Sequence, residues 1–291
     1  MVRVVTTAVV LFAIGSASTG TAQTESGPGT RAGFCATNFP IVLAEGLFAF
    51  SHFNIAESLM ECGARVFLTD VDPTNSSTVR GAQLLEDIEM VLAVTGADRV
   101  NLFAHGQGGL DARVVLETKP SVLASIIQAG APNLGSSAGN LGVLFGADLL
   151  ILAGVAGGQL GTNLVAALDD ISTLGAASFN AEFPKGLPTE MCGEGPAEVD
   201  GVALFSFGGT VVASNLADPA DGLLGLFSLG NFAQPNDGFV GRCSSHFGVV
   251  VRDDFAMNHL DLVNQTRGAI GPDDPVQVYR MLATRLVGMG L

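Results

Sequence analysis

Short apolar runs alternate with helix-like segments along the chain, and this alternation constrains the fold more than any other feature of the sequence. Runs typical of buried strands cover residues 39–44, 65–69, 99–103, 123–128, 202–207 and 247–251. The segments with helical spacing cover residues 55–62, 79–94 and 110–118. Strand, helix and strand in succession predict an α/β fold, in which helices cover both faces of a mostly parallel sheet.

The first 22 residues have the layout of a secretory signal. Arg3 precedes an apolar run from Val4 to Ile14, and small residues follow as far as Ala22. We expect cleavage after Ala22; an uncleaved anchor is the alternative, although the run is too short to span a bilayer. Residues 23–291 then form one domain of a secreted protein, either extracellular or periplasmic.

Charge and cysteine content narrow the choice of partners. Acidic residues outnumber basic residues by 28 to 13, and no stretch gathers Lys and Arg into a basic stripe. Nucleic acid is therefore excluded as a partner, and anionic membrane surfaces are disfavoured. Outside the cytoplasm the 4 cysteines are expected to form disulfides, because none of their spacings resembles a metal site.

Residues 141–165 are apolar and rich in glycine, and Asp148 is their only charged residue. A transmembrane helix is one interpretation of such a length. We favour an apolar lid over a pocket, covering about residues 134–168, because the segment interrupts an α/β pattern and has a carboxylate near its middle. An apolar lid predicts contact with a lipid interface rather than integral membrane insertion.

A glycine-rich turn, residues 104–109, links the predicted strand 99–103 to the predicted helix 110–118. Strand, sharp turn and helix have the shape of the nucleophile elbow, G-x-S-x-G, which lifts its central side chain above the end of the sheet. Here the central residue is Gly106. A phosphate-binding loop has a similar outline. However, no Lys-Ser/Thr pair follows, and no acidic residue is placed to bind a ribose.

Many segments between residues 38 and 290 resemble the secreted triacylglycerol lipases of the foldase-dependent Pseudomonas and Burkholderia type. The resemblance implies an α/β-hydrolase fold with an apolar lid. The segments that carry it are residues 40–44, 79–81, 83–85, 100–102, 130–132, 179–181, 192–195, 236–238, 243–246 and 257–261.

In that family a Ser, an Asp and a His form a catalytic triad, and the resemblance implies that Asp237 and His259 are its last two members. Gly106 stands at the position of the serine. The neighbouring departures from the family pattern are Ala104 for Gly, Gln107 for His, and Glu45 for the His of the oxyanion element. Four departures at one site favour natural loss of the chemistry, because an engineered knockout would normally change the serine alone.

Backbone groups of the site depend less on side-chain identity. By the resemblance, the N–H groups of Leu47 and Gln107 form the oxyanion hole. A structural calcium site is also implied, with the carboxylates of Asp218 and Asp261 and backbone oxygens of Gln265 and Ala269. Two solvated carboxylates are the alternative interpretation.

The resemblance implies one disulfide, between Cys192 and Cys243. Cys35 and Cys62 lie outside the family pattern. They could pair, since one precedes the first strand and the other ends the first helix, but the sequence leaves this open.

Two hypotheses for the function remain. In the first, this is a secreted lipase-like pseudoenzyme that keeps its acyl pocket and binds a lipid or fatty-acyl ligand, or a partner protein, without hydrolysis. In the second, it is a carboxylic ester hydrolase of low or altered activity, in which His259 and Asp237 activate a water in the space left by the serine. The resemblance further implies a lipase-specific foldase chaperone as a folding partner.

Overall fold

The computed structural model describes residues 33–145, 161–215, 217–218, 220–230, 234–265 and 270–291. Seven strands form one sheet, in which β2, β1, β3, β4 and β6 are neighbours in that order and both β5 and β7 pair with β6. Every pair is parallel except β5 with β6. The strands are β1 (Ile41–Ala44), β2 (Val66–Leu68), β3 (Val100–His105), β4 (Leu123–Ala129), β5 (Glu198–Val199), β6 (Val202–Gly209) and β7 (Val249–Phe255).

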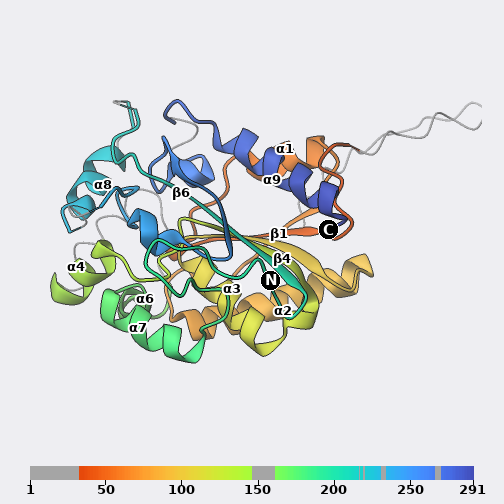
Figure 1. Cartoon of the computed structure of the whole chain (residues 1–291), viewed down its shortest axis with the longest axis horizontal. Helices are drawn as coiled ribbons and strands as arrows, with labels where there is room; N and C mark the ends of the chain where they lie inside the picture. Colours follow the sequence, from red (N-terminus) through yellow and green to blue (C-terminus); the bar gives the residue numbers. More distant parts are fainter. Residues whose placement is uncertain (1–32, 146–160, 216, 219, 231–233, 266–269) are drawn as a thin grey trace, which may run out of the picture.

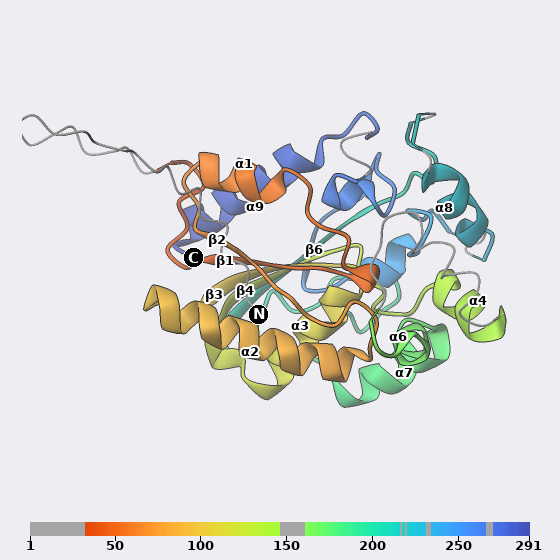
Figure 2. The same cartoon turned by 180° about the vertical axis from the view of Figure 1, so that it is seen from behind.

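Two pairs of helices sandwich the sheet (Figures 1 and 2). Helices α1 (Ile55–Glu61) and α9 (Pro275–Met289) lie on one face, and α2 (Ser77–Thr95) and α3 (Gln107–Thr118) lie on the other. Side chains alternate along β1, so that Ile41 and Leu43 join the core under α1 and α9 while Val42 and Ala44 join the core under α2 and α3. The predicted α/β architecture is therefore confirmed.

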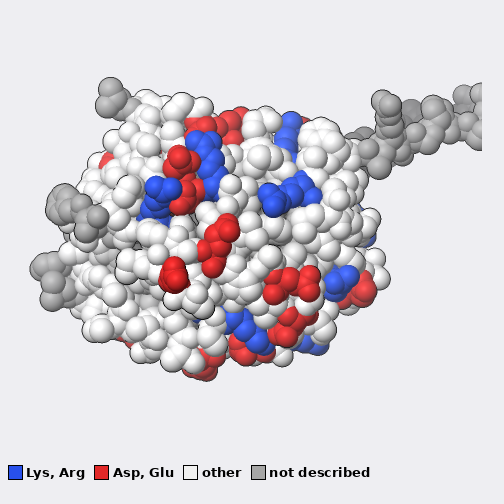
Figure 3. Space-filling view, in the orientation of Figure 1, with Lys and Arg blue, Asp and Glu red and all other residues white. Residues whose placement is uncertain are grey.

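The remaining helices gather at one end of the molecule, on the left of Figure 1. They are α4 (Ser137–Phe145), α6 (Leu164–Asp170), α7 (Thr173–Glu182) and α8 (Ala220–Ser228). Short 3₁₀ turns complete the fold: η1 (Leu47–Ala49), η2 (Pro120–Val122), η3 (Arg242–Ser245) and η4 (Asp261–Val263). The surface over α4 and α8 carries few charged side chains (Figure 3).

Two sequence predictions fall on residues that the structure does not describe. The signal segment 1–22 lies wholly outside the described residues, and so do residues 146–160 of the predicted lid. Within the described part of the lid, α4 and α6 form its two ends. In the ranges that the structure describes, no helix is both long and apolar enough to cross a membrane.

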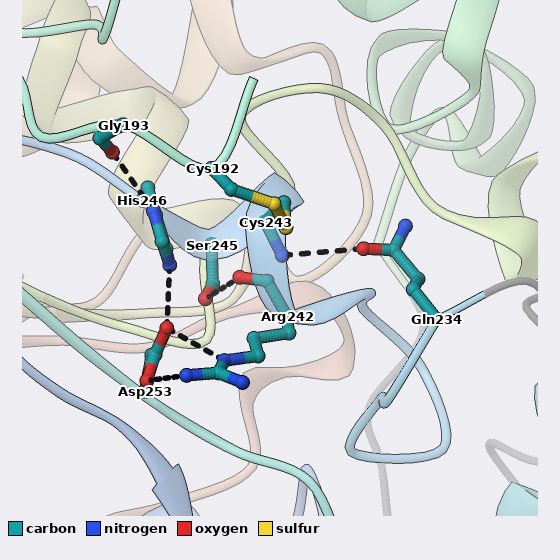
Figure 4. The surroundings of a disulfide bond; sticks show 8 residues. All are labelled: Cys192, Gly193, Gln234, Arg242, Cys243, Ser245, His246 and Asp253. Carbon is teal, nitrogen blue, oxygen red and sulfur yellow. Dashed lines mark hydrogen bonds and ion pairs between the residues drawn. A yellow bond between two sulfur atoms is a disulfide. The ribbon is translucent and has the colours of Figure 1, made fainter. Parts of the chain in front are cut away.

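Two disulfides link the cysteines. Cys192 bonds to Cys243, as the family resemblance implied, and Cys35 bonds to Cys62, which settles the pairing that the sequence left open. Figure 4 shows that the polar contacts of His246 with Gly193 and Asp253 lie beside the Cys192–Cys243 disulfide. The His246 ring there lies 2.9 Å through Nδ1 from the carbonyl oxygen of Gly193, and 2.9 Å through Nε2 from Oδ2 of Asp253. The disulfide and the contacts of His246 together hold the loop before β5 against the segment that leads into β7.

Candidate active site

Gly106 forms the turn between β3 and α3. Its backbone has φ 52° and ψ −125°, a conformation that glycine adopts without the steric cost of a Cβ. A Cβ built at this position would lie 3.2 Å from Nε2 of His259 and 3.8 Å from the Cα of Gly46. A side chain at position 106 would therefore meet the imidazole directly, which is the geometry of a nucleophile elbow.

Asp237 and His259, predicted as partners, come together from two different loops. Nδ1 of His259 lies 2.8 Å from Oδ2 of Asp237, and both residues are buried. The backbone N–H of His259 donates to the Asp237 carbonyl at 2.8 Å. The other carboxylate oxygen of Asp237 accepts hydrogen bonds from the backbone N–H groups of Phe239 and Val240, at 2.9 and 2.6 Å. These bonds fix the carboxylate, and the carboxylate orients the imidazole.

The His259 ring packs against two other rings. Phe239 stacks on it with ring centroids 4.9 Å apart, and His105 is tilted against it with centroids 4.6 Å apart. Burial lowers the pKa of His105 well below its usual value, with a further contribution from the neighbouring histidines, so this ring is neutral. Within the described chain, Nε2 of His259 makes no hydrogen bond and faces Gly106.

Two backbone donors belong to the residues that follow Gly106 and Gly46 in the chain, Gln107 and Leu47. Gln107 is the first residue of α3 and Leu47 is the first residue of η1, so neither N–H has a partner inside its own helix. Neither donates elsewhere within the described ranges. A Cβ at Gly46 would lie 3.5 Å from the nitrogen of Gln107, so the loop that carries Leu47 packs against the turn. Such a pair of donors can stabilise a negatively charged oxygen.

The Gln107 side chain binds the loop before α2. Its Nε2 donates to the carbonyl oxygen of Asn75 at 2.8 Å and to Oγ of Ser77 at 3.2 Å. The same loop accepts a hydrogen bond from the backbone N–H of Phe48, through the carbonyl oxygen of Pro73 at 2.9 Å. The side chain of Gln107 thus connects the turn, through the loop before α2, to the loop that carries Leu47.

Arg80, for which the sequence analysis predicted no role, binds the backbone of the loop that carries Leu47. The fully buried guanidinium donates to Oδ2 of Asp111 at 2.8 Å and to the carbonyl oxygen of Glu45 at 2.7 Å. It also donates to the carbonyl oxygens of Gly46 and Asp72. One sequence signal points to this role, because Arg80 falls on the apolar face of the predicted helix 79–94, four residues before Leu84.

Gly130, at the end of β4, makes room for the pair formed by Asp237 and His259. Its φ is 56°, and a Cβ built there would lie 3.1 Å from Oδ2 of Asp237, 3.3 Å from Nδ1 of His259 and 2.6 Å from Cδ1 of the buried Leu262. The approach of the pair to β4 therefore requires glycine. No role was predicted for it either, although its segment, residues 130–132, carries part of the family resemblance.

Gly130→Ala is expected to separate the Asp237 carboxylate from the His259 ring and to lower the free energy of unfolding by about 1–3 kcal/mol, because the methyl group adds both overlap and backbone strain. Urea unfolding gives the stability, and the ¹H–¹⁵N spectrum of the His259 ring reports the hydrogen bond. Gly201→Ala is the control, since that glycine has φ 79° but a Cβ there would meet nothing within 4 Å. Equal stability and an unchanged ring spectrum in both variants would contradict this role.

The predicted calcium ligands lie close to the same site. Asp261 is fully buried, and within the described ranges its Oδ1 has no hydrogen-bond partner. The pKa of Asp261 is raised to about 6, mainly by burial and also by the charges of Asp218 and Asp221, against hydrogen bonds from Ser214 and Asn258. The carboxylate of Asp218 is also buried. The two predicted carboxylates are thus neighbours.

Other parts of the predicted calcium set are less complete. Gln265 follows η4, and its backbone N–H donates to the carbonyl oxygen of Leu260 at 3.0 Å, while Ala269 lies outside the described residues. The described residues contain no group of three or more His, Cys, Asp or Glu that could hold a metal ion. A cation between Asp218 and Asp261 would therefore need backbone or amide oxygens as further ligands.

Comparison with known proteins was made by sequence and by structure. No family model matches the chain. The chain is 39% identical to a triacylglycerol lipase of Vibrio cholerae, covering 90% of this chain and 92% of that protein. It is 37% identical to a triacylglycerol lipase of Pseudomonas fragi, over 88% and 98%. A triacylglycerol lipase of Burkholderia plantarii is 30% identical, over 89% and 88%.

Solved structures give the same fold. A lipase of Bacillus licheniformis in its mature form matches with a TM-score of 0.64 and 20% identity, covering 87% of this chain and 93% of that one. Staphylococcus hyicus lipase matches with a TM-score of 0.57 and 12% identity, over 92% and 99%. These matches confirm the α/β-hydrolase fold, and the sequence relatives show that the chain belongs to the bacterial triacylglycerol lipase family.

Proposed function

We propose that this protein binds acyl lipids at the site around Gly106 and His259 and does not hydrolyse them through an acyl-enzyme. The observation that carries the proposal is the elbow itself. A glycine occupies the position whose Cβ would lie 3.2 Å from Nε2 of His259, where the family resemblance places the nucleophilic serine. Glycine has no hydroxyl to acylate. Removal of the catalytic serine from a serine protease costs about 10⁶-fold in turnover.

The remainder of the site supports a binding role. Apolar side chains are also exposed on three helices that pack against one another, α4, α6 and α7. Val143 on α4, Val165 on α6 and Leu174 on α7 are 56%, 70% and 83% exposed. Exposed apolar side chains grouped in this way favour contact with a lipid interface.

One observation favours a second function, ester hydrolysis by water. Nε2 of His259 faces Gly106 without a hydrogen-bond partner in the described chain, and Asp237 orients the ring at 2.8 Å. A water in this space could lose its proton to Nε2 and attack an ester carbonyl. Oxyanion donors and binding alone leave about 10³–10⁴-fold acceleration over water in triad knockouts. Weak turnover without dependence on His259 would therefore not support this second function.

Turnover by the unmodified protein separates the two functions. Hydrolysis of p-nitrophenyl esters and of a triglyceride emulsion is measured for the purified, calcium-loaded protein and for His259→Ala. We expect both proteins to show the same low rate. A rate that falls by tenfold or more in His259→Ala would establish the second function and reject the first.

We also propose a structural calcium ion held by Asp218 and Asp261. Hard carboxylate oxygens suit Ca²⁺, and the buried Oδ1 of Asp261 without a hydrogen-bond partner fits a cation ligand. Backbone oxygens of Gln265 and Ala269 complete the proposed set. The ion would hold the loop of His259, which lies two residues before Asp261, and would take no part in proton transfer.

Calcium removal is expected to lower the melting temperature of the protein. At a calcium concentration about 100 times the dissociation constant, the ion would contribute about 2.7 kcal/mol of stability. Thermal unfolding is followed with excess Ca²⁺ and with EDTA. Asp261→Asn should remove the difference, whereas Asp254→Asn, an exposed carboxylate elsewhere, should keep it. Equal melting temperatures of the unmodified protein under both conditions, with no calcium binding by calorimetry, would refute the calcium site.

Export from the cytoplasm and a lipase-specific foldase are further proposals. The two disulfides support export, because such bonds persist in oxidising compartments. The foldase is supported by the family resemblance alone.

A further inference from the structure

Hydrogen-bonding groups of two kinds surround Gly106. The first are the backbone N–H of Gln107, at the start of the 12-residue helix α3, whose N-terminus favours negative charge, and the N–H of Leu47, which follows Gly46; the Cα of Gly46 lies 3.8 Å from a Cβ built at Gly106. The second is His259, which is only 6% exposed and whose Nε2 is the nearest atom to that Cβ, at 3.2 Å. Neither the N–H groups nor Nε2 have a partner within the described chain.

We propose that this site binds the carboxyl group of free fatty acids, and that it binds the acid in preference to the ester. The inference rests on the proposed function, since an active serine hydrolase would fill the same space with its nucleophile. It goes further by naming the chemical group that is recognised.

The match between the acid and the site can be followed atom by atom. One carboxyl oxygen accepts hydrogen bonds from the N–H groups of Leu47 and Gln107, as an oxyanion would. The carboxyl carbon lies where the acyl carbon of an acyl-enzyme would lie. The second oxygen takes the place of the serine oxygen that Gly106 lacks, next to Nε2 of His259. The free acid therefore supplies the oxygen that the protein has lost.

One proton completes this arrangement. Nδ1 of His259 is already bonded to Asp237, so Nε2 is the ring nitrogen left to meet the ligand. The carboxyl proton of the acid lies between the second carboxyl oxygen and Nε2 in a hydrogen bond, and no covalent bond between protein and ligand forms or breaks.

An ester lacks this proton and carries an alkyl group on its second oxygen. Bound at the same place, the ester covers Nε2 and leaves it unpaired, which costs the desolvation of that nitrogen. The acid is therefore expected to bind at least about tenfold more tightly than its ester, the ratio that corresponds to 1.4 kcal/mol.

Calorimetry of the calcium-loaded full-length protein tests the proposal at one fixed pH, with octanoic acid, methyl octanoate and 1-octanol as ligands. The unmodified protein should bind the acid at least about tenfold more tightly than the ester or the alcohol. Gly106→Ala places a methyl group within bonding distance of the point where the second oxygen would lie, so it excludes that oxygen and should remove this preference. Gly288→Ala is the matched control, because a Cβ at that helical glycine meets nothing within 4 Å, and it should bind like the unmodified protein.

A second variant covers the case in which Gly106→Ala does not fold, as judged by its thermal unfolding. His259→Gln should lose the preference for the acid while retaining affinity for the ester. Equal affinities of the unmodified protein for acid and ester, an unaltered preference in either variant, or no binding of octanoic acid would overturn the inference. Failure of the proposed function would give a different result. Methyl octanoate would be hydrolysed during the titration, and this hydrolysis would depend on His259.

Discussion

Gly106→Ser is expected to raise ester turnover by at least about 10³-fold, since the serine is the largest single contributor to triad catalysis. The new Cβ would lie 3.2 Å from Nε2 of His259, so the hydroxyl can reach its general base. Turnover of p-nitrophenyl butyrate is compared with that of Gly106→Ala, which adds the Cβ without the hydroxyl. An increase below tenfold in a folded Gly106→Ser protein would contradict the account of the site.

Gly106→Ser should be less stable than the unmodified protein, and its rescued rate should stay below that of an intact lipase. A non-glycine residue at φ 52° and ψ −125° stores strain of about 1–3 kcal/mol, so Gly106→Ser should be less stable than the unmodified protein. By the family resemblance, Glu45 replaces the His of the oxyanion element, and a carboxylate there is expected to oppose a growing oxyanion. The gain must also depend on His259, so the double variant Gly106→Ser/His259→Ala should return to the basal rate.

Arg80→Met is expected to destabilise the protein by about 3–5 kcal/mol, because it leaves the carboxylate of Asp111 buried without its ion-pair partner. Arg80 and Asp111 are both almost completely buried and lie 2.8 Å apart. The backbone oxygens of Glu45 and Gly46 lose their donor as well. The free energy of unfolding in urea measures the effect. Arg99→Met is the control, because that guanidinium has no ion-pair partner in the described chain and stacks on the ring of Phe39.

The destabilisation caused by Arg80→Met is expected to increase as the pH rises. Burial raises the pKa of Asp111 to about 7, although Arg80 opposes the shift. A carboxyl group whose pKa is higher in the folded protein contributes stability at low pH that is lost as the pH rises towards 7. Loss of Arg80 removes the opposing charge, so Arg80→Met should cost more stability at pH 8 than at pH 5. Asp111→Asn in the same chain should abolish that difference, and a loss independent of pH would contradict it.

Continuous apolar runs made the central strands predictable, because strands buried on both faces leave little room for polar residues. The predicted run 123–128 and the observed β4 (Leu123–Ala129) differ by one residue. Helix α3 begins at Gln107, three residues before the predicted start at 110, since Gly106 itself is the N-cap. The helix α9 (Pro275–Met289) was missed, although Asp274 caps it, Pro275 is its first residue and Gly290 ends it.

Contacts between distant segments were beyond the reach of the sequence. The roles of Arg80 and Gly130 depend on which loops pack against α2 and β4, and no local pattern contains that information. The pairing of Cys35 with Cys62 likewise depends on the position of α1 beside the segment before β1. By contrast, the proximity of Asp237 and His259 followed from family resemblance, and the geometry agrees with it.

The central claim is that the unmodified protein forms no acyl-enzyme, and intact-mass spectrometry tests it most directly. The unmodified protein and Gly106→Ser are incubated with a fluorophosphonate and, separately, with p-nitrophenyl butyrate quenched in acid. The account predicts no mass increase for the unmodified protein and a single adduct, mapped to residue 106, for Gly106→Ser. A stoichiometric adduct on the unmodified protein would reveal another nucleophile and would contradict the account.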